Sequence, residues 1–153
     1  LRSASLVRRV EHILLQTGLN PELLELEITE SVASWGAEEM KQLLTELKST
    51  GVKLAIDDFG TQYSSLNRIS QLPVDRIKID RQFISNLPDD IKDSAIVNLI
   101  ISLAGKLGIE IVAEGVESAE QNEFLRSIGC NYVQGFYHYQ PMSASDLDSI
   151  LFS

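Results

Sequence analysis

The sequence predicts an α/β protein with a parallel sheet, whose polar strand ends converge as they do in a barrel. Three observations carry this prediction. Segments with helical periodicity alternate with short strand-like segments along the whole chain, and strands joined by crossover helices must pair in parallel. Four helical segments end near a glycine, which is a common left-handed stop of a helix. Five strand-like segments carry a polar residue near their C-terminal ends, where the active sites of α/β barrels lie.

Each predicted element has its own signal in the sequence. Apolar residues recur every three or four positions in the first helix, from Leu6 to Leu14, and the strand after it alternates apolar residues with glutamate. The later strands are short apolar runs, and Ser143 is the expected N-cap of the last helix. The helix-ending glycines are Gly18, Gly51, Gly108 and Gly129. In chain order we expect a helix over residues 5–17, a strand over 24–30, a helix over 37–49, a strand over 53–59, a short helix over 64–71, a strand over 76–80, a helix over 93–106, a strand over 109–116, a helix over 120–127, a strand over 132–135 and a helix over 143–151.

The parity of the strand residues separates a polar face from an apolar face, because successive side chains of a strand point to opposite sides. Polar residues that share one face would be costly against packed helices, but they suit the lumen of a barrel. A complete barrel has eight strands in about 250 residues. We therefore expect residues 1–153 to be one partial domain with about five parallel strands, and the N-terminal part of the barrel to lie upstream. The polar face is predicted to carry Glu27, Asp57, Lys78, Glu114 and Gln134, and the apolar face Leu26, Ile56, Ile77 and Ala113.

Composition narrows the class of function. The net charge of −9 disfavours direct binding to a DNA or RNA backbone, which relies on lysine and arginine, so a phosphate ligand would need metal ions as intermediaries. The single cysteine, Cys130, cannot form an internal disulfide, and we expect a reducing, cytoplasmic compartment. No long uninterrupted apolar segment predicts a membrane span in this chain. Attachment to a longer, membrane-anchored protein stays open.

Four carboxylates at neighbouring strand ends predict a metal site. Glu27, Asp57, Asp58 and Glu114 would repel one another unless they were protonated or bridged by cations. Hard divalent cations such as Mg²⁺ or Mn²⁺ prefer carboxylate oxygens and water. Asp57 should reach the lumen directly, and Asp58, at the frayed end of its strand, can turn to a second ion. We therefore expect two ions.

Lys78 allows three interpretations. It can form an inward ion pair with a neighbouring carboxylate, or it can hold an attacking hydroxide or a substrate phosphate oxygen. A barrel aldolase with a Schiff-base lysine is the third interpretation, but the surrounding carboxylates would raise rather than lower the lysine pKa.

Several residues near the strand ends are candidates for support rather than chemistry. Glu30 lies beyond its strand and is better placed to hold a loop than to bind metal. The hydroxyl-rich segment 59–65, which includes Thr61 and Ser64, can hydrogen-bond Glu30 while it orients the two aspartates. Glu117 either supports the site from behind or begins the next helix. The histidines, His12 and His138, have no metal-ligand companion in the sequence.

At these residues the chain resembles the EAL-domain cyclic-di-GMP phosphodiesterases. The resemblance implies a modified TIM-type (β/α)8 barrel and two Mg²⁺ or Mn²⁺ ions that hydrolyse one phosphodiester of cyclic-di-GMP to the linear dinucleotide. It assigns metal binding to Glu27, Asp57 and Asp58, and makes Glu114 a ligand or general base. Lys78 and Gln134 would surround the attacking water, and Glu30 would anchor the 59–65 loop. The five matching motifs, in order, are Leu26-Glu27-Ile28-Thr29-Glu30-Ser31, Asp57-Asp58-Phe59-Gly60-Thr61, Lys78-Ile79-Asp80, Ala113-Glu114-Gly115-Val116-Glu117 and Gln134-Gly135-Phe136.

Two departures qualify the resemblance. The family's Glu-Ala-Leu segment and a later metal-binding asparagine both belong to a region that precedes these residues. Gln62 also stands where the family usually has glycine. A degenerate domain that acts as a cyclic-di-GMP receptor or a protein-interaction module is therefore the alternative. In either case the expected partners are cyclic-di-GMP, an upstream sensory or diguanylate-cyclase-like domain, and a second copy in a homodimer, and residues 1–153 alone are expected to be inactive.

Overall fold

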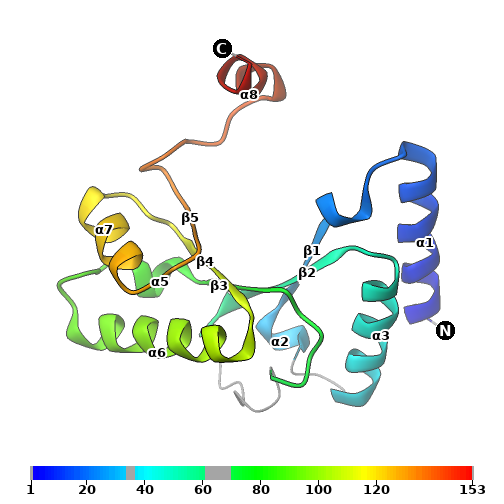
Figure 1. The fold of residues 1–153 in the computed structure, drawn as a ribbon, viewed down its shortest axis with the longest axis horizontal. Coiled ribbons are helices and arrows are strands. Elements are labelled where there is room, and N and C mark those ends of the chain that lie inside the picture. Colours follow the sequence, from blue (N-terminus) through cyan, green and yellow to red (C-terminus); the bar gives the residue numbers. More distant parts are fainter. Residues whose placement is uncertain (1, 34–36, 61–69, 153) are drawn as a thin grey trace.

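Five parallel strands form one sheet in the order in which they occur in the chain (Figure 1). The computed structural model describes residues 2–33, 37–60 and 70–152. Within these ranges each strand pairs with its sequence neighbours, so the first and last strands are the edges of an open sheet. This confirms the predicted α/β class with about five parallel strands. The strands are β1 (Glu25–Thr29), β2 (Lys53–Phe59), β3 (Arg76–Ile79), β4 (Glu110–Glu114) and β5 (Tyr132–Gln134).

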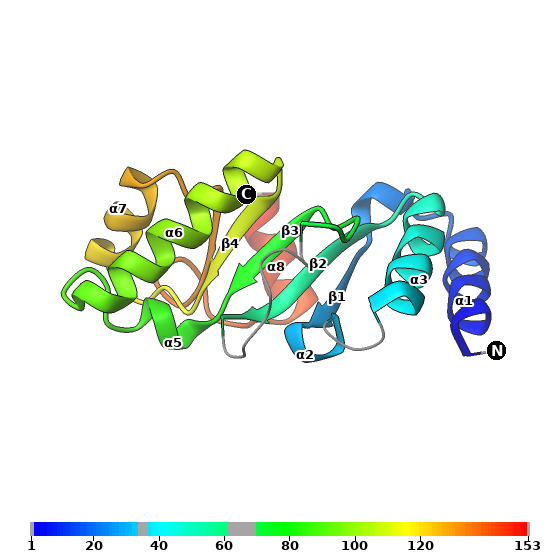
Figure 2. The same ribbon diagram turned by 90° about the horizontal axis from the view of Figure 1, so that it is seen from below.

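The helices leave one face of the sheet open. Helices α3 and α6 lie against one face, and α1 packs outside α3, whereas α8 stands away from the sheet on the other side (Figures 1 and 2). Among the described residues, no helix combines the length and apolar character that a membrane span needs. The helices are α1 (Arg2–Thr17), the 3-10 turn η1 (Pro21–Leu23), α2 (Glu30–Ala33), α3 (Ala37–Ser49), α5 (Arg81–Ile84), α6 (Ile91–Leu107), α7 (Ala119–Ser127) and α8 (Ala144–Leu151).

The core lies between the helices and the apolar face of the sheet. Leu54, Ile56, Ile79 and Ala113 are completely buried, and they occupy the alternate strand positions that parity assigns to this face. Complete burial of a leucine or isoleucine side chain contributes about 1.5–3 kcal/mol. This one-sided burial fixes which strand residues face the helices, and therefore which residues face the open side.

Capping residues define the helix ends. Asp90 begins α6 by accepting hydrogen bonds from the backbone N–H groups of Lys92 and Asp93, at 2.8 and 3.0 Å. Gly108 ends the same helix with φ 71°, a conformation that costs glycine little. The other three helix-ending glycines also have positive φ, as the sequence predicts. Ser143 caps α8, which confirms its predicted role.

The described elements differ from the predicted ones mainly where they are short. The sequence analysis missed η1, α2 and α5, each of which has three or four residues, because so few residues cannot show a helical period. The strand predicted over 109–116 is limited to Glu110–Glu114. Of the short helix predicted over 64–71, residues 64–69 lie outside the described ranges, and residues 70 and 71 form a turn.

Candidate active site

Lys78 lies at the centre of the polar face of the sheet. Its Nζ is 2.7 Å from Glu27 Oε1, 2.7 Å from Glu114 Oε1 and 3.3 Å from Asp57 Oδ1. The three carboxylates come from β1, β4 and β2, so one cation on β3 joins four strands. Only 8% of the Lys78 side chain is exposed. Strand parity therefore correctly predicts that these four side chains converge.

The surroundings of Lys78 keep it charged. Burial alone would lower the pKa of its amine, but the hydrogen bonds to Glu114 and Glu27 outweigh burial and raise that pKa well above its usual value. The charge of Asp57 acts in the same direction. A Schiff base requires a neutral amine as nucleophile, so this geometry argues against the aldolase interpretation.

Asp57 and Asp58 lie at a bulge near the end of β2. The pairing of β2 with β3 shifts in register between Ile56 and Phe59, and Asp58 has φ 55°, which is uncommon for a residue other than glycine. The sequence predicts a frayed strand end here, whereas the structure has a bulge within the strand. Bulges change the direction of side chains next to active sites. Here the bulge allows the adjacent carboxylates of Asp57 and Asp58 both to lie on the open side of the sheet.

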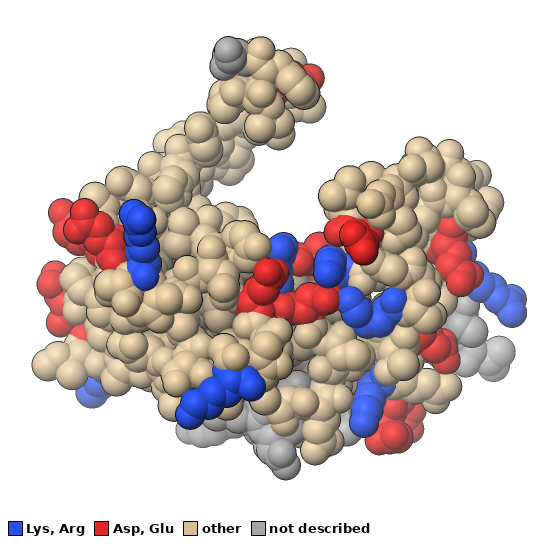
Figure 3. Space-filling model, in the orientation of Figure 1, with Lys and Arg blue, Asp and Glu red and all other residues tan. Residues whose placement is uncertain are grey.

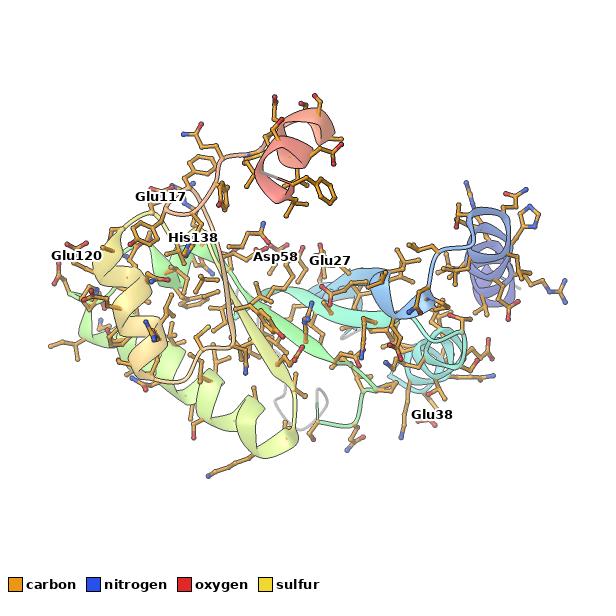
Figure 4. All side chains as sticks on the ribbon, turned by 45° about the horizontal axis from the view of Figure 1, so that its top comes forward. Glu27, Glu38, Asp58, Glu117, Glu120 and His138 are labelled. Carbon is orange, nitrogen blue, oxygen red and sulfur yellow. The ribbon has the colours of Figure 1, made fainter. Side chains whose placement is uncertain are left out.

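The two aspartates differ in environment. Oδ1 of Asp57 is buried and makes no hydrogen bond among the described residues, although it lies 3.3 Å from Lys78 Nζ. Asp58 is exposed, and Figure 4 shows it on the same open side as Glu27. The negative charge of Asp57, followed by partial burial and the charge of Asp80, raises the pKa of Asp58. This crowding of negative charge is what a bound cation would relieve.

Glu30 contacts the segment that follows the two aspartates. It is 1% exposed and begins α2 directly after β1. Its Oε2 accepts a hydrogen bond of 2.8 Å from the backbone N–H of Gly60. This contact joins the start of α2 to the residue that follows β2. Thr61, Gln62 and Ser64 lie outside the described residues.

Glu117 does not begin a helix, because α7 starts at Ala119 with Ser118 as its cap. Its Oε1 instead forms an ion pair with Arg81 Nη2 at 2.8 Å. The backbone N–H of Glu117 donates to Gln121 Oε1 at 2.7 Å. Of the two interpretations of Glu117, the structure excludes the helix start, and Glu117 is tied to α5.

A groove of about 410 Å³ runs along the polar face of the sheet. Figure 3 shows acidic and basic side chains together at the bottom of the hollow between α8 and the N-terminal region. Gln134 pairs in register with Glu114 and lines the groove together with Lys78 and Glu27. His138 also lines it, and its Nε2 lies 3.3 Å from Asn122 Oδ1. Of the predicted candidates, Glu27, Lys78 and Gln134 thus line one groove.

Residues 1–141 of the chain match the EAL domain family. This match covers more than nine-tenths of the 153 residues. The chain belongs to the EAL domain family.

Relatives and solved structures agree with this assignment. The bifunctional diguanylate cyclase/cyclic di-GMP phosphodiesterase MucR of Pseudomonas aeruginosa is 47% identical to this chain over 94% of its residues. The matched region is 21% of the length of MucR, so the chain spans only about a fifth of this relative. The solved PaMucR phosphodiesterase, a c-di-GMP complex, superimposes with a TM-score of 0.90, 47% identity and coverage of 94% of this chain and 58% of that one. The manganese/cy-diGMP complex of Klebsiella pneumoniae BlrP1 has a TM-score of 0.80, 35% identity and coverage of 86% and 33%.

The carboxylates of this EAL domain fit a divalent cation in donor type. Glu27, Asp57, Asp58 and Glu114 offer hard oxygen ligands, and Asp57 holds a buried oxygen without a hydrogen bond. Within residues 2–33, 37–60 and 70–152, however, no three acidic, histidine or cysteine side chains are grouped closely enough to hold a metal. The ammonium group of Lys78 lies where these carboxylates converge.

A second row of charged side chains crosses the sheet, two positions before Glu27 and Lys78 along β1 and β3. It was not predicted from the sequence. Arg76 donates from Nη1 to Glu25 at 3.0 Å and from Nε to Glu110 at 2.8 Å. Its guanidinium carbon lies 4.7 Å from the ring centre of Tyr132, whose hydroxyl is 3.3 Å from Glu110 Oε1. We call these four residues the Arg76 row. Lys78, Glu27, Asp57 and Glu114 form the Lys78 row. Arg76 precedes Lys78 by two positions, as Glu25 precedes Glu27, so the same parity could have found the Arg76 row.

Proposed function

We propose that this chain is part of a domain that hydrolyses cyclic-di-GMP to the linear dinucleotide with two divalent cations. The observation that carries the proposal is the convergence of Glu27, Asp57 and Glu114 on Lys78 at the open side of the sheet. The chain is 47% identical to MucR, whose name includes cyclic di-GMP phosphodiesterase. The match covers 58% of the solved PaMucR chain, and we propose that the complete domain includes further strands.

In this proposal the carboxylates of the Lys78 row, together with Asp58, have defined tasks. Glu27, Asp57 and Asp58 would hold the cations, with Glu114 as a further ligand or as the base that takes a proton from the attacking water. When bound, two cations would supply positive charge for the attacking and leaving oxygens of the phosphodiester. The BlrP1 complex with manganese and cy-diGMP supports Mn²⁺, and Mg²⁺ is the alternative because it prefers the same oxygen ligands.

Lys78 and Gln134 would act on the reacting oxygens directly. The cationic amine of Lys78 would attract a phosphate oxygen or the attacking hydroxide. Gln134 pairs with Glu114 in register and would orient the water with its amide. Glu30 would fix the loop that follows Asp58 through its hydrogen bond to Gly60.

A receptor that binds cyclic-di-GMP without hydrolysing it is the second candidate. It is favoured by one observation: the ammonium group of Lys78 already pairs with Glu27 and Glu114 at 2.7 Å. The upstream glutamate and asparagine that the family resemblance implies would distinguish the two, because an enzyme needs them to complete the ligand set.

The test is a hydrolysis assay on a protein that contains the whole domain. Chromatography should show conversion of cyclic-di-GMP to the linear dinucleotide with Mn²⁺, and chelation with EDTA should stop it. Calorimetry with the same protein and Ca²⁺ measures binding separately. Binding without conversion would support the receptor, and neither binding nor conversion would contradict both candidates.

The proposed context is a longer, cytoplasmically exposed protein. MucR is named as a bifunctional protein that includes a diguanylate cyclase, and we propose a comparable upstream cyclase-like or sensory domain here, and a homodimer. Light scattering of the complete protein with and without cyclic-di-GMP would measure the oligomeric state.

A further inference from the structure

The short helix α5 contacts both loops that carry candidate site residues. It follows β3 directly, and Asp80 caps it by accepting a 2.8 Å hydrogen bond from the backbone N–H of Gln82. On one side is the chain after Asp57 and Asp58, and on the other is the chain after Glu114. Two residues of α5, Phe83 and Arg81, make these contacts.

Phe83 packs against Gly60. Gly60 has φ 98°, and a Cβ added to it would lie 2.6 Å from Cε2 and 3.1 Å from Cζ of the Phe83 ring. The backbone of Gly60 is therefore in direct contact with the ring. Its N–H group is hydrogen-bonded to Glu30 at 2.8 Å. The two contacts together hold the backbone two residues after Asp58.

Arg81 packs against Gly115 in the same way. Gly115 has φ 70°, and an added Cβ would lie 2.8 Å from both Cβ and Cδ of Arg81 and closer still to its Cγ. The aliphatic stem of Arg81 thus covers the residue directly after Glu114. The guanidinium reaches beyond it to Glu117 Oε1, at 2.8 Å.

The stem contact, rather than the ion pair, is the stronger constraint. The Arg81 and Glu117 side chains are 62% and 44% exposed, and exposed ion pairs contribute little to stability. Long charged side chains can instead pack through their methylene groups. Only glycine leaves room for the ring at position 60 and for the stem at position 115.

We propose that Phe83 and Arg81 are positioning residues that fix the distance between the aspartate pair of β2 and Glu114 of β4. A rigid helical turn that touches both loops transmits a shift of one loop to the other. The inference rests on the proposed function for its catalytic consequence, but the mechanical coupling can be measured without turnover.

The experiment is hydrogen–deuterium exchange of the whole-domain protein, read on peptides that cover residues 57–60 and residues 113–117. Arg81→Ala should speed exchange in both peptides, and Phe83→Ala should do the same. Gln82→Ala lies on the same helical turn, and it should change neither peptide. Arg81→Met keeps the stem without the charge and should resemble the wild type. The coupling would be overturned if Phe83→Ala sped exchange only at residues 57–60 and Arg81→Ala only at residues 113–117. An Arg81→Met variant that behaves like Arg81→Ala would also overturn it.

A double-mutant cycle adds a second test. Gly115→Ala should speed exchange at residues 113–117, because its Cβ meets the Arg81 stem. Adding Arg81→Ala to Gly115→Ala should then restore part of the protection, although Arg81→Ala alone reduces it. Strictly additive effects would show that the stem and the glycine do not act through one contact.

Kinetics then separate the inference from the proposed function. If the wild type hydrolyses cyclic-di-GMP, Arg81→Ala and Phe83→Ala should lower kcat by about 10-fold or more with little change in KM, as expected for misplacement of reacting groups. A wild type without activity would contradict the proposed function alone, since the exchange results judge the coupling independently.

Discussion

Nζ of Lys78 lies 2.7 Å from Oε1 of Glu114, so a buried cation on β3 neutralises a carboxylate at the end of β4. The same ammonium group lies 2.7 Å from Glu27 Oε1. Lys78 therefore offsets part of the negative charge of these carboxylates. A cation that enters the site must compete with this amine for the same carboxylate oxygens.

Lys78→Met should separate cation binding from chemistry. Removal of the ammonium leaves the carboxylates facing one another, so we expect Mn²⁺ to bind as tightly as in the wild type or more tightly. Hydrolysis should fall by about 10²–10³, the usual cost of one group that stabilises charge in the transition state. Calorimetric Mn²⁺ titration and steady-state assays measure the two effects. Loss of Mn²⁺ binding with hydrolysis would show that Lys78 supports the ligands rather than the reaction.

Asp57→Asn should abolish Mn²⁺-dependent hydrolysis and leave the fold intact. The substitution keeps the shape of the side chain but removes its charge from a buried oxygen that has no hydrogen bond. Calorimetry should show a lower Mn²⁺ stoichiometry, and circular dichroism should be unchanged. Unchanged stoichiometry and activity would remove Asp57 from the site.

Glu114→Gln distinguishes a base from a ligand. Loss of a general base costs about 10²–10⁴ in rate, and a variant that lacks only the base should still bind cyclic-di-GMP with metal. If Glu114 is mainly a ligand, excess Mn²⁺ should recover part of the rate. Turnover near that of the wild type at limiting Mn²⁺ would contradict both roles.

Asp75→Asn tests an ion pair on the side of the sheet away from the Lys78 row. Asp75 accepts hydrogen bonds from Lys48 Nζ at 2.9 and 2.8 Å and from the backbone N–H of Leu54 at 2.8 Å. Burial alone would raise the pKa of Asp75, but these hydrogen bonds and the nearby lysines lower it on balance. The substitution should lower the free energy of unfolding of the whole domain by about 1–3 kcal/mol at neutral pH.

The sign of the pH dependence follows from the lowered pKa of Asp75. A carboxyl with a lowered pKa stabilises the fold above its unfolded-state pKa of about 3.9 and loses this effect as the pH falls through the folded-state value. The difference in unfolding free energy between Asp75→Asn and the wild type should therefore shrink below about pH 4. Glu38→Gln, at an exposed position of α3, should stay within about 0.5 kcal/mol of the wild type throughout. A difference that does not vary with pH would show that the ion pair is not its origin.

Residues 1–153 expressed alone should associate and should not hydrolyse cyclic-di-GMP. Strands β1 and β5 are edges of the open sheet, and unpaired edges favour pairing with other chains. Phe152, next to α8, is 84% exposed and adds apolar surface. Size-exclusion chromatography with light scattering and a turnover assay measure both properties. A monodisperse, active monomer would show that further strands are dispensable.

Much of the fold could be predicted because its long elements carry a clear period. The helix over 37–49 and the strand over 53–59 have the predicted bounds, and the alternation of apolar and polar residues correctly assigned the two faces of the sheet. Helix α5 has four residues, too few for any periodic signal, and its contacts with Gly60 and Gly115 depend on the tertiary arrangement.

The site could be predicted only in part, because sequence shows which charges share a face but not how far a side chain reaches. Parity brought Glu27, Asp57 and Glu114 together with Lys78, but it could not show that Lys78 lies among them. A two-residue alternation also cannot reveal the β2 bulge, which gives Asp58 its positive φ. The metal-binding roles of these residues remain predictions.

The two rows of charge on the sheet have different roles. The Lys78 row is proposed to carry the chemistry, and the Arg76 row joins the strands. The Arg76 row joins β1, β3 and β4 two positions before Glu27 and Lys78. We therefore expect a substitution in the Lys78 row to leave the strands aligned. The charges that join the strands and the charges proposed for hydrolysis therefore stand at different positions of the same strands, so a change in one row leaves the contacts of the other in place.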